Sequence, residues 1–183
     1  MLASTSVVRH ELIIQPNAGA LSVSHRVLRI LITLNWLFGA AILGLLIWTF
    51  VAAEFVARAL GTDDSPRALL GMRLIMVIGV LATPVTNAIL TRLLSIVETV
   101  RAGDPFVSVN AARLQTIAWA VLGLEVSRLV VVGIANSVST AARPIHIDWN
   151  LSVTPWLAVL LLFVLARVFD HGARMREDLD GTV

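Results

Sequence analysis

The sequence predicts an all-α polytopic membrane protein with four transmembrane helices, and three observations lead to that fold class. The composition is 57% hydrophobic and only 14% charged, with a mean hydropathy of +0.87, whereas a soluble domain needs more polar residues to cover its core. The apolar residues gather in four spans of nearly membrane length. The arginines are distributed unevenly between the segments that connect these spans.

The four apolar spans cover about residues 27–53, 70–94, 114–135 and 153–169. A helix of roughly 20 residues crosses the hydrocarbon layer, and each span is close to that length. Lipid offers the backbone no other hydrogen-bond partners, so each span is expected to be helical. Residues 27–183 are therefore expected to form a single four-helix transmembrane bundle. The preceding segment 1–26 is expected to be partly disordered. The first span is not expected to be a signal peptide, because it follows 26 mostly polar residues and its apolar run is about twice as long as a usual signal-peptide core.

The distribution of arginine orients the predicted helices. Nine arginines lie on one side, against three on the other. The positive-inside rule then places both termini and the connection between the second and third spans in the cytoplasm. We expect a multi-pass protein of a bacterial inner membrane, because a lysine-free, arginine-only composition is typical of GC-rich bacterial genomes. The nine are Arg9, Arg26, Arg29, Arg92, Arg101, Arg113, Arg167, Arg174 and Arg176, and the three are Arg58, Arg67 and Arg143.

The cytoplasmic connection 95–113 contains a charged, proline-containing elbow. Apolar residues at helical spacing before it predict that the second helix continues past the membrane. Gly103 is expected to end that helix, and Pro105 cannot continue it and favours an extended Asp104. Asn110 is expected to be the N-cap of the third helix. The elbow is thus interpreted as a helix stop followed by a restart.

The C-terminal segment 170–183 is predicted to extend the fourth helix into the cytoplasm. Val168, Gly172, Met175 and Leu179 recur at a spacing of three and four residues, which forms a narrow apolar stripe. Asp170 and Arg174 are spaced to form an ion pair on the wet face of this helix.

These two cytoplasmic segments allow two compatible interpretations. One is an ordered helical hairpin with Phe106 packed against its own helices. The other is a docking surface for a cytoplasmic partner. The residues of that hypothetical surface are Arg101, Asp104, Pro105, Phe106, Asn110, Arg113, Met175 and Leu179.

The same segments carry a resemblance to a known family. "RAGDPFVSVNAARLQTIAW" and "LLLFVLARVFDHGARMREDLDGTV" resemble an uncharacterised family of small bacterial inner-membrane proteins, a domain of unknown function with four predicted helices. Its genes often lie beside one for a Cro/repressor-type helix-turn-helix protein, which implies a membrane-bound controller of a transcription factor. The resemblance supplies no catalytic residue. The matching residues are Gly103, Asp104, Pro105, Phe106, Asn110, Arg113, Leu114, Phe169, Gly172, Ala173, Arg174, Asp178, Leu179, Gly181, Thr182 and Val183.

Ionisable side chains within the spans form a second candidate site. Glu125 lies near the middle of the third span, and Arg128 follows one turn later on the same face. Arg73 begins the second helix and is expected either to snorkel to the surface or to reach that face. Charges in lipid are costly, so the three residues form either a structural ion pair, a sensing or proton-linked site, or part of a solute pathway.

Smaller polar and glycine features are expected to hold the helices together. Asn35 of the first span and Thr83 and Asn87 of the second are expected to make interhelical hydrogen bonds. Ala40 and Gly44 are spaced for a close helix contact.

The chain lacks the motifs of the common enzyme classes. There are no cysteines, and all four histidines lie outside the spans, so neither a thiol site nor a haem or histidine-metal site is expected. No nucleophile–base pair, P-loop or dinucleotide fingerprint occurs. We expect a non-enzymatic protein without a cofactor and without direct nucleic-acid binding, because no basic run occurs.

Two functions remain open at this point. The first is a regulatory membrane protein that binds or sequesters a small helix-turn-helix transcription regulator. The alternative is a small transporter or transporter subunit that uses Glu125 and Arg128, for which a homodimer would be the smallest plausible unit. Membrane lipid is the partner common to both.

Overall fold

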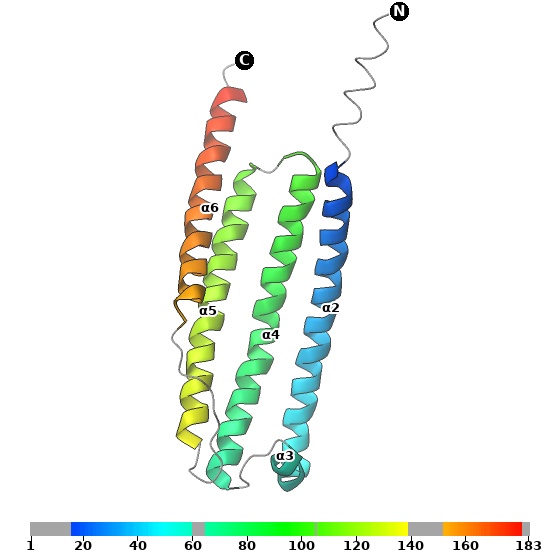
Figure 1. Ribbon diagram of the computed structural model, residues 1–183, viewed down its shortest axis with the longest axis vertical. Helices are drawn as coiled ribbons and strands as arrows, with labels where there is room; N and C mark the ends of the chain where they lie inside the picture. Colours follow the sequence, from blue (N-terminus) through cyan, green and yellow to red (C-terminus); the bar gives the residue numbers. More distant parts are fainter. Residues whose placement is uncertain (1–15, 60–64, 105, 139–151, 181–183) are drawn as a thin grey trace, which may run out of the picture.

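The computed structural model describes residues 16–59, 65–104, 106–138 and 152–180, and almost all of them are α-helical (Figure 1). The helices are α2 (Pro16–Val51), α3 (Ala53–Ala59), α4 (Pro66–Arg101), α5 (Ser108–Val138) and α6 (Val153–Asp180). Four of them, all except α3, are long and apolar enough to cross a membrane. The predicted fold class is thereby confirmed.

The helices extend beyond the predicted spans at one end of the molecule. α2 begins at Pro16 rather than near residue 27, whereas α4 continues past its apolar span to Arg101, as expected for a helix that stops at Gly103. α6 runs to Asp180, as expected from its apolar stripe. A hydropathy span marks only the lipid-facing part of a helix, whereas the helix itself continues as long as its backbone bonds and packing support it. The short helix α3, directly after α2, was not predicted.

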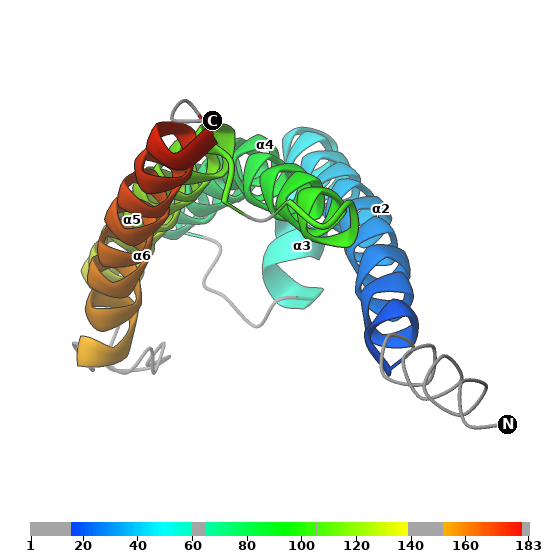
Figure 2. The ribbon, with the colours of Figure 1, turned by 90° about the horizontal axis from the view of Figure 1, so that it is seen from above.

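The four long helices form an open, curved row rather than a closed bundle. Seen along their axes, they follow the order α2, α4, α5 and α6 (Figure 2). Among the described residues, the extensive contacts between long helices join only neighbours in this row. Within the described residues no extensive contact joins α2 to α6, an open arrangement about which the sequence made no prediction. Lipid is as apolar as the outer helix faces, so no hydrophobic force drives the first and last helices together.

The two ends of the row differ in what joins the helices. At one end the elbow, residues 102–107, links α4 to α5 beside the first turns of α2 and the last turns of α6 (Figure 1). We refer to this as the elbow end. At the opposite end lie α3 and the first turns of α4, where the Ser65 hydroxyl accepts a hydrogen bond from the backbone N–H of Ala68 and Pro66 occupies the first turn.

Polar side chains join α2 to α4 as the sequence predicted. Asn35 Nδ2 donates to the backbone oxygen of Thr83 at 3.0 Å. Trp36 Nε1 donates to Asn87 Oδ1 at 3.2 Å, and the indole remains half exposed. The hydroxyl of Thr83 donates back to the carbonyl of Gly79 within its own helix. The interhelical hydrogen bonds predicted for the side chains of Asn35 and Asn87 are confirmed, whereas Thr83 takes part through its backbone carbonyl and not through its hydroxyl.

The closest approach between α2 and α4 lies at Gly39, not at the predicted pair Ala40 and Gly44. A Cβ on Gly39 would lie 2.5 Å from Thr83 Cγ2, whereas one on Gly44 would meet nothing within 4 Å. Ala40 and Gly44 are both exposed. The prediction was one residue out of register, and one residue turns a helical side chain by about 100°.

Candidate functional site

The elbow begins where the sequence places it. Ala102 follows the last residue of α4, and its backbone N–H donates to the carbonyl of Glu98. Gly103 has a φ of +83°, a left-handed conformation that a glycine adopts without a Cβ clash. The N–H of Asp104 then donates to the carbonyl of Thr99 at 3.1 Å. This is a glycine-terminated helix end of the predicted kind.

The restart differs from the prediction, because α5 begins at Ser108 and Asn110 lies inside its first turn. Asn110 is completely buried and does not cap the helix. Its Nδ2 donates to Thr99 Oγ1 of α4 at 2.7 Å, and its Oδ1 accepts from Arg113 Nη1 at 2.9 Å. The same Arg113 nitrogen donates to the carbonyl of Ser95 at 3.2 Å. These residues therefore tie α5 to α4 instead of facing a partner.

The elbow also contacts α6. The ring of Phe106 packs on that of Phe169, with centroids 5.3 Å apart. Gly172 makes room for it, since a Cβ there would lie 3.2 Å from Phe106 Cδ1. Asp104 forms an ion pair with Arg176. The two segments that carry the family resemblance therefore meet in space. Phe106 packs against α6, whereas the sequence predicted packing against the helices of its own hairpin.

Beside this contact the surface is hollowed and apolar. A cavity of about 520 Å³ lies between the elbow and the last turns of α6. Phe106 and Met175 are each about half exposed there, at 46% and 53%. We call this cavity the apolar hollow. Its lining residues are Phe106, Arg167, Val168, His171, Gly172, Met175 and Arg176.

The hollow brings together only part of the predicted docking residues. Phe106 and Met175 line it, and Asp104 touches it through Arg176. Arg101 is exposed at the end of α4 and does not line the hollow. Pro105 and the side chain of Leu179 lie outside the described part of the chain. Sequence reasoning did not assign His171 and Arg167 to the surface, although both flank Val168 and Gly172 of the predicted stripe at helical spacing.

The intramembrane site contains Glu125 and Arg128 but not Arg73. Arg128 Nε donates to both carboxylate oxygens of Glu125 at 3.0 Å, and Nη2 donates to Oε1 at 2.6 Å. The Glu125 side chain is 8% exposed, whereas that of Arg128 is 39% exposed. A bidentate pair between residues one turn apart lowers the cost of both charges in lipid.

Arg73 instead binds the end of α2. Its Nη2 donates to the backbone oxygen of Thr49 at 2.8 Å, and its Nε donates to Thr49 Oγ1 at 3.3 Å. The guanidinium also lies 4.4 Å from the centre of the Phe50 ring. A cation near carbonyls in the last turn of a helix is favourable. Arg73 therefore links α4 to α2, apart from the Glu125–Arg128 pair.

Comparison with known proteins identifies one matching sequence family. The sequence model described as "Protein of unknown function (DUF2975)" matches residues 73–183, which include α5, α6, the elbow and most of α4. No curated protein and no solved structure matches the chain.

Proposed function

The chain belongs to the DUF2975 family, and we propose that this member is a non-enzymatic membrane protein that binds a small cytoplasmic helix-turn-helix regulator at its elbow end. The observation that carries the proposal is the apolar hollow. Phe106, Val168 and Met175 expose apolar surface beside the charged side chains of Arg167 and Arg176 at the elbow end. Exposed apolar surface of this kind is typical of a protein-binding groove.

The chemistry of the hollow indicates the kind of partner segment. Its apolar floor suits the apolar face of an amphipathic helix, with anchors three and four residues apart. Arg167 and Arg176 lie at its rim, and Arg176 is already paired with Asp104. A partner helix with an acidic residue beside its apolar face would complement Arg167. The identity of the partner as a transcription regulator rests on the family resemblance described above.

Binding at the membrane would act on transcription through mass action. A regulator held at the hollow is withdrawn from the pool that binds DNA, in proportion to the membrane protein present and its affinity. The hydrogen bonds of Asn110 would fix α5 against α4, and the Phe106–Phe169 and Asp104–Arg176 contacts would hold the elbow against α6, so that the hollow is formed before the partner arrives.

A direct test compares variants of the hollow with a variant of the opposite end. Phe106→Ala and Met175→Glu should each reduce co-purification of a small helix-turn-helix regulator from the same genome, by about tenfold or more for loss of a central apolar anchor. Phe55→Ala is the matched control, since Phe55 is 66% exposed on α3. Met175→Glu leaves the Phe106–Phe169 contact intact, so a folding defect and a binding defect can be distinguished. Normal co-purification with both hollow variants would refute the proposal.

The proposal also requires the elbow end to face the cytoplasm. Eight arginines of the described residues lie toward that end, whereas Arg58, Arg67 and Arg73 lie toward the other. Reporter fusions after Ala102 and after Val183 should therefore report a cytoplasmic location, and a fusion near Asp64 should report a periplasmic one. A fusion after Ala102 that reports the periplasm would exclude a cytoplasmic partner altogether.

The alternative function, transport through an intramembrane charged site, has weaker support. Glu125 and Arg128 line neither the apolar hollow nor a second cavity, which lies between α5 and α6. Both carboxylate oxygens of Glu125 are already bound by Arg128. The pair is better accounted for as a means of inserting two charges into lipid.

A further inference from the structure

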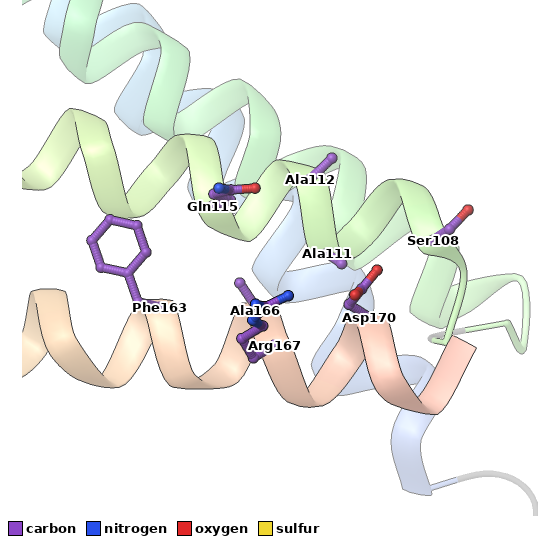
Figure 3. A pocket seen from close by; sticks show the side chains of 8 residues that line it. All are labelled: Ser108, Ala111, Ala112, Gln115, Phe163, Ala166, Arg167 and Asp170. Carbon is purple, nitrogen blue, oxygen red and sulfur yellow. The ribbon is translucent and has the colours of Figure 1, made fainter. Parts of the chain in front are cut away.

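A second cavity lies between α5 and α6 on the side of Arg167 away from the apolar hollow. It has a volume of about 490 Å³ and is lined by four residues of each helix. In Figure 3 the ring of Phe163 lies toward one end and the carboxylate of Asp170 toward the other, with Ala166 and Arg167 between them. We call it the α5/α6 groove. Its lining residues are Ser108, Ala111, Ala112, Gln115, Phe163, Ala166, Arg167 and Asp170.

The groove exists because three of its lining residues are alanines. Ala111 and Ala166 are buried where α5 and α6 touch, whereas Ala112 is exposed and its methyl group leaves open space above the seam. A longer side chain at position 112 would occupy that space. The α5/α6 groove therefore depends on the small side chain of Ala112, an exposed position at which helix packing does not require an alanine.

The depth of the groove matches the polar layer of a membrane. Phe163 at its deeper end stacks edge-on with Trp119, with ring centroids 5.2 Å apart, and the indole is 59% exposed. Exposed tryptophan is typical of the boundary between hydrocarbon and headgroups. From Phe163 to Asp170 the helix rises about 10 Å, enough to cross the roughly 5–8 Å of headgroup region on one side of a bilayer. With Phe163 at the hydrocarbon boundary, the Asp170 end of the groove would lie at or beyond the phosphates.

The polar groups of the groove favour an anion. Arg167 is exposed and makes no hydrogen bond or ion pair with any other described residue. The one carboxylate in the groove, Asp170, is compensated by Arg174 at 3.0 Å. Ser108 and Gln115 add a hydroxyl and an amide that can donate to phosphate or ester oxygens. Arg167 is therefore the uncompensated charge of the groove.

We propose that the α5/α6 groove binds one anionic glycerophospholipid from the surrounding leaflet. Its phosphate accepts hydrogen bonds from Arg167, its glycerol esters lie beside Gln115, and one acyl chain runs down the helix face past Phe163. Basic pockets between transmembrane helices are a recurrent form of anionic-lipid site. A zwitterionic headgroup fits less well, because its own cation would compete with Arg167 for the phosphate. Arg167 also lines the apolar hollow, so the two proposals share this residue; Ala112→Leu tests the groove alone, because Ala112 does not line the hollow.

Three single variants separate this site from the general positive charge of the elbow end. Arg167→Gln removes the phosphate ligand. Ala112→Leu fills the groove and leaves every charge in place. Arg101→Gln is the matched control, since Arg101 is exposed at the same end, has no partner among the described residues and does not line the groove. Each purified protein is first checked for thermal unfolding in detergent without added lipid.

Binding of phosphatidylglycerol is measured by native mass spectrometry and by the shift in unfolding temperature. Phosphatidylcholine and inorganic phosphate are tested in parallel as probes. We expect the wild-type chain to retain one phosphatidylglycerol. Arg167→Gln should weaken that binding by about tenfold or more, the worth of a hydrogen bond to a charged group, and Ala112→Leu should weaken it as well. Arg101→Gln should change it by less than about twofold, because exposed charges outside the groove contribute little.

Each other result overturns the inference. Equal protection by phosphatidylcholine would show a site without selectivity for anions, and protection by inorganic phosphate alone would show a free-anion site. Equal losses in Arg167→Gln and Arg101→Gln would indicate diffuse attraction by the arginine-rich end. If Arg167→Gln does not fold, unchanged binding in the folded Ala112→Leu variant is sufficient to refute the site.

Discussion

The intramembrane pair of α5 and the ion pair at the elbow end of α6 have the same chemistry in different surroundings. Glu125 and Arg128 lie near the middle of a helix long enough to span the membrane, and the Glu125 side chain is 8% exposed. Asp170 and Arg174 lie in the extension of α6, and the Arg174 side chain is 70% exposed. Both pairs form within a single helix, so neither joins one helix to another.

The comparison shows that polar groups have two different roles in this fold, namely charge neutralisation within one helix and contact between helices. In the membrane interior a pair within one helix makes two necessary charges tolerable before any helix packing occurs. At the elbow end water already solvates the charges, and the contacts that matter there cross between helices, as Asn110 does to Thr99 and Asp104 to Arg176. Stability should therefore depend strongly on the interior pair and on the buried Asn110, and weakly on the exposed pairs.

The largest effect is expected at the interior pair. Glu125→Gln removes the carboxylate and leaves Arg128 charged in lipid, so the unfolding temperature in detergent micelles should fall by roughly 5 °C or more. Arg128→Gln should cause a fall of similar size. The double change should lower the temperature by less than the sum of the two, since residues in contact are not additive. Thermal unfolding of all four proteins measures this coupling.

If Glu125→Gln, Arg128→Gln and the double change all unfold with the wild-type chain, the contrast between interior and exposed pairs is wrong. If stability is retained and regulator binding is lost, the pair has a role in signalling rather than in stability.

The next effect is expected at Asn110, the fully buried polar residue of the elbow end. Asn110→Leu is close to it in volume but leaves Thr99 Oγ1 and Arg113 without this partner. We expect a loss of about 1–3 kcal/mol in the free energy of unfolding, the cost of leaving buried polar groups unsatisfied. Reversible unfolding in mixed micelles measures it. The control Thr116→Val, at an exposed position of the same helix, should stay within about 0.5 kcal/mol.

Some features of the fold were predictable from the sequence, and the position of Asn110 was not. The four spans, the stop at Gly103 and the Asp170–Arg174 pair follow from local spacing and hydropathy, and the structure confirms them. Asn110 was assigned to a cap because its residue type favours caps. Its buried position depends on Thr99 of the preceding helix, and no local pattern contains the crossing of two helices.

The candidate surface was predictable only along each helix. The spacing of Val168, Gly172 and Met175 reveals a stripe, but the contact of Gly172 with Phe106 arises from a fold-back across more than sixty residues. The same holds for Arg73, which was expected either to snorkel to the surface or to reach the Glu125–Arg128 face and instead binds Thr49 in the structure. The openness of the row is also hidden, since lipid-facing and helix-facing apolar residues look alike.

A smaller effect is expected at the contact between the elbow and α6. Asp104→Asn weakens the ion pair with Arg176, whose two side chains are 42% and 50% exposed. The expected loss is about 0.2–1 kcal/mol, the range for exposed pairs. Because salt screens such pairs, the difference from the wild-type chain should vanish in about 1 M NaCl, where the Debye length is near 3 Å. A loss that persists unchanged in high salt would show that the contact acts through packing instead.

The smallest effect is expected at the exposed pair of α6, Asp170 and Arg174. Arg174→Gln removes an ion pair between residues four apart on an exposed helix face, which stabilises a helix by about 0.3–0.5 kcal/mol. The shift in the unfolding temperature should therefore be about 1–2 °C at most, well below that of Glu125→Gln measured in the same micelles.

Arg174→Gln has a second consequence, because Asp170 would then place an uncompensated carboxylate in the α5/α6 groove. Binding of phosphatidylglycerol should weaken in Arg174→Gln and recover in the double variant Asp170→Asn/Arg174→Gln. A stability loss as large as that of Glu125→Gln would remove the distinction between the two pairs, and a failure of the double variant to recover would show that Arg174 affects lipid binding other than through Asp170.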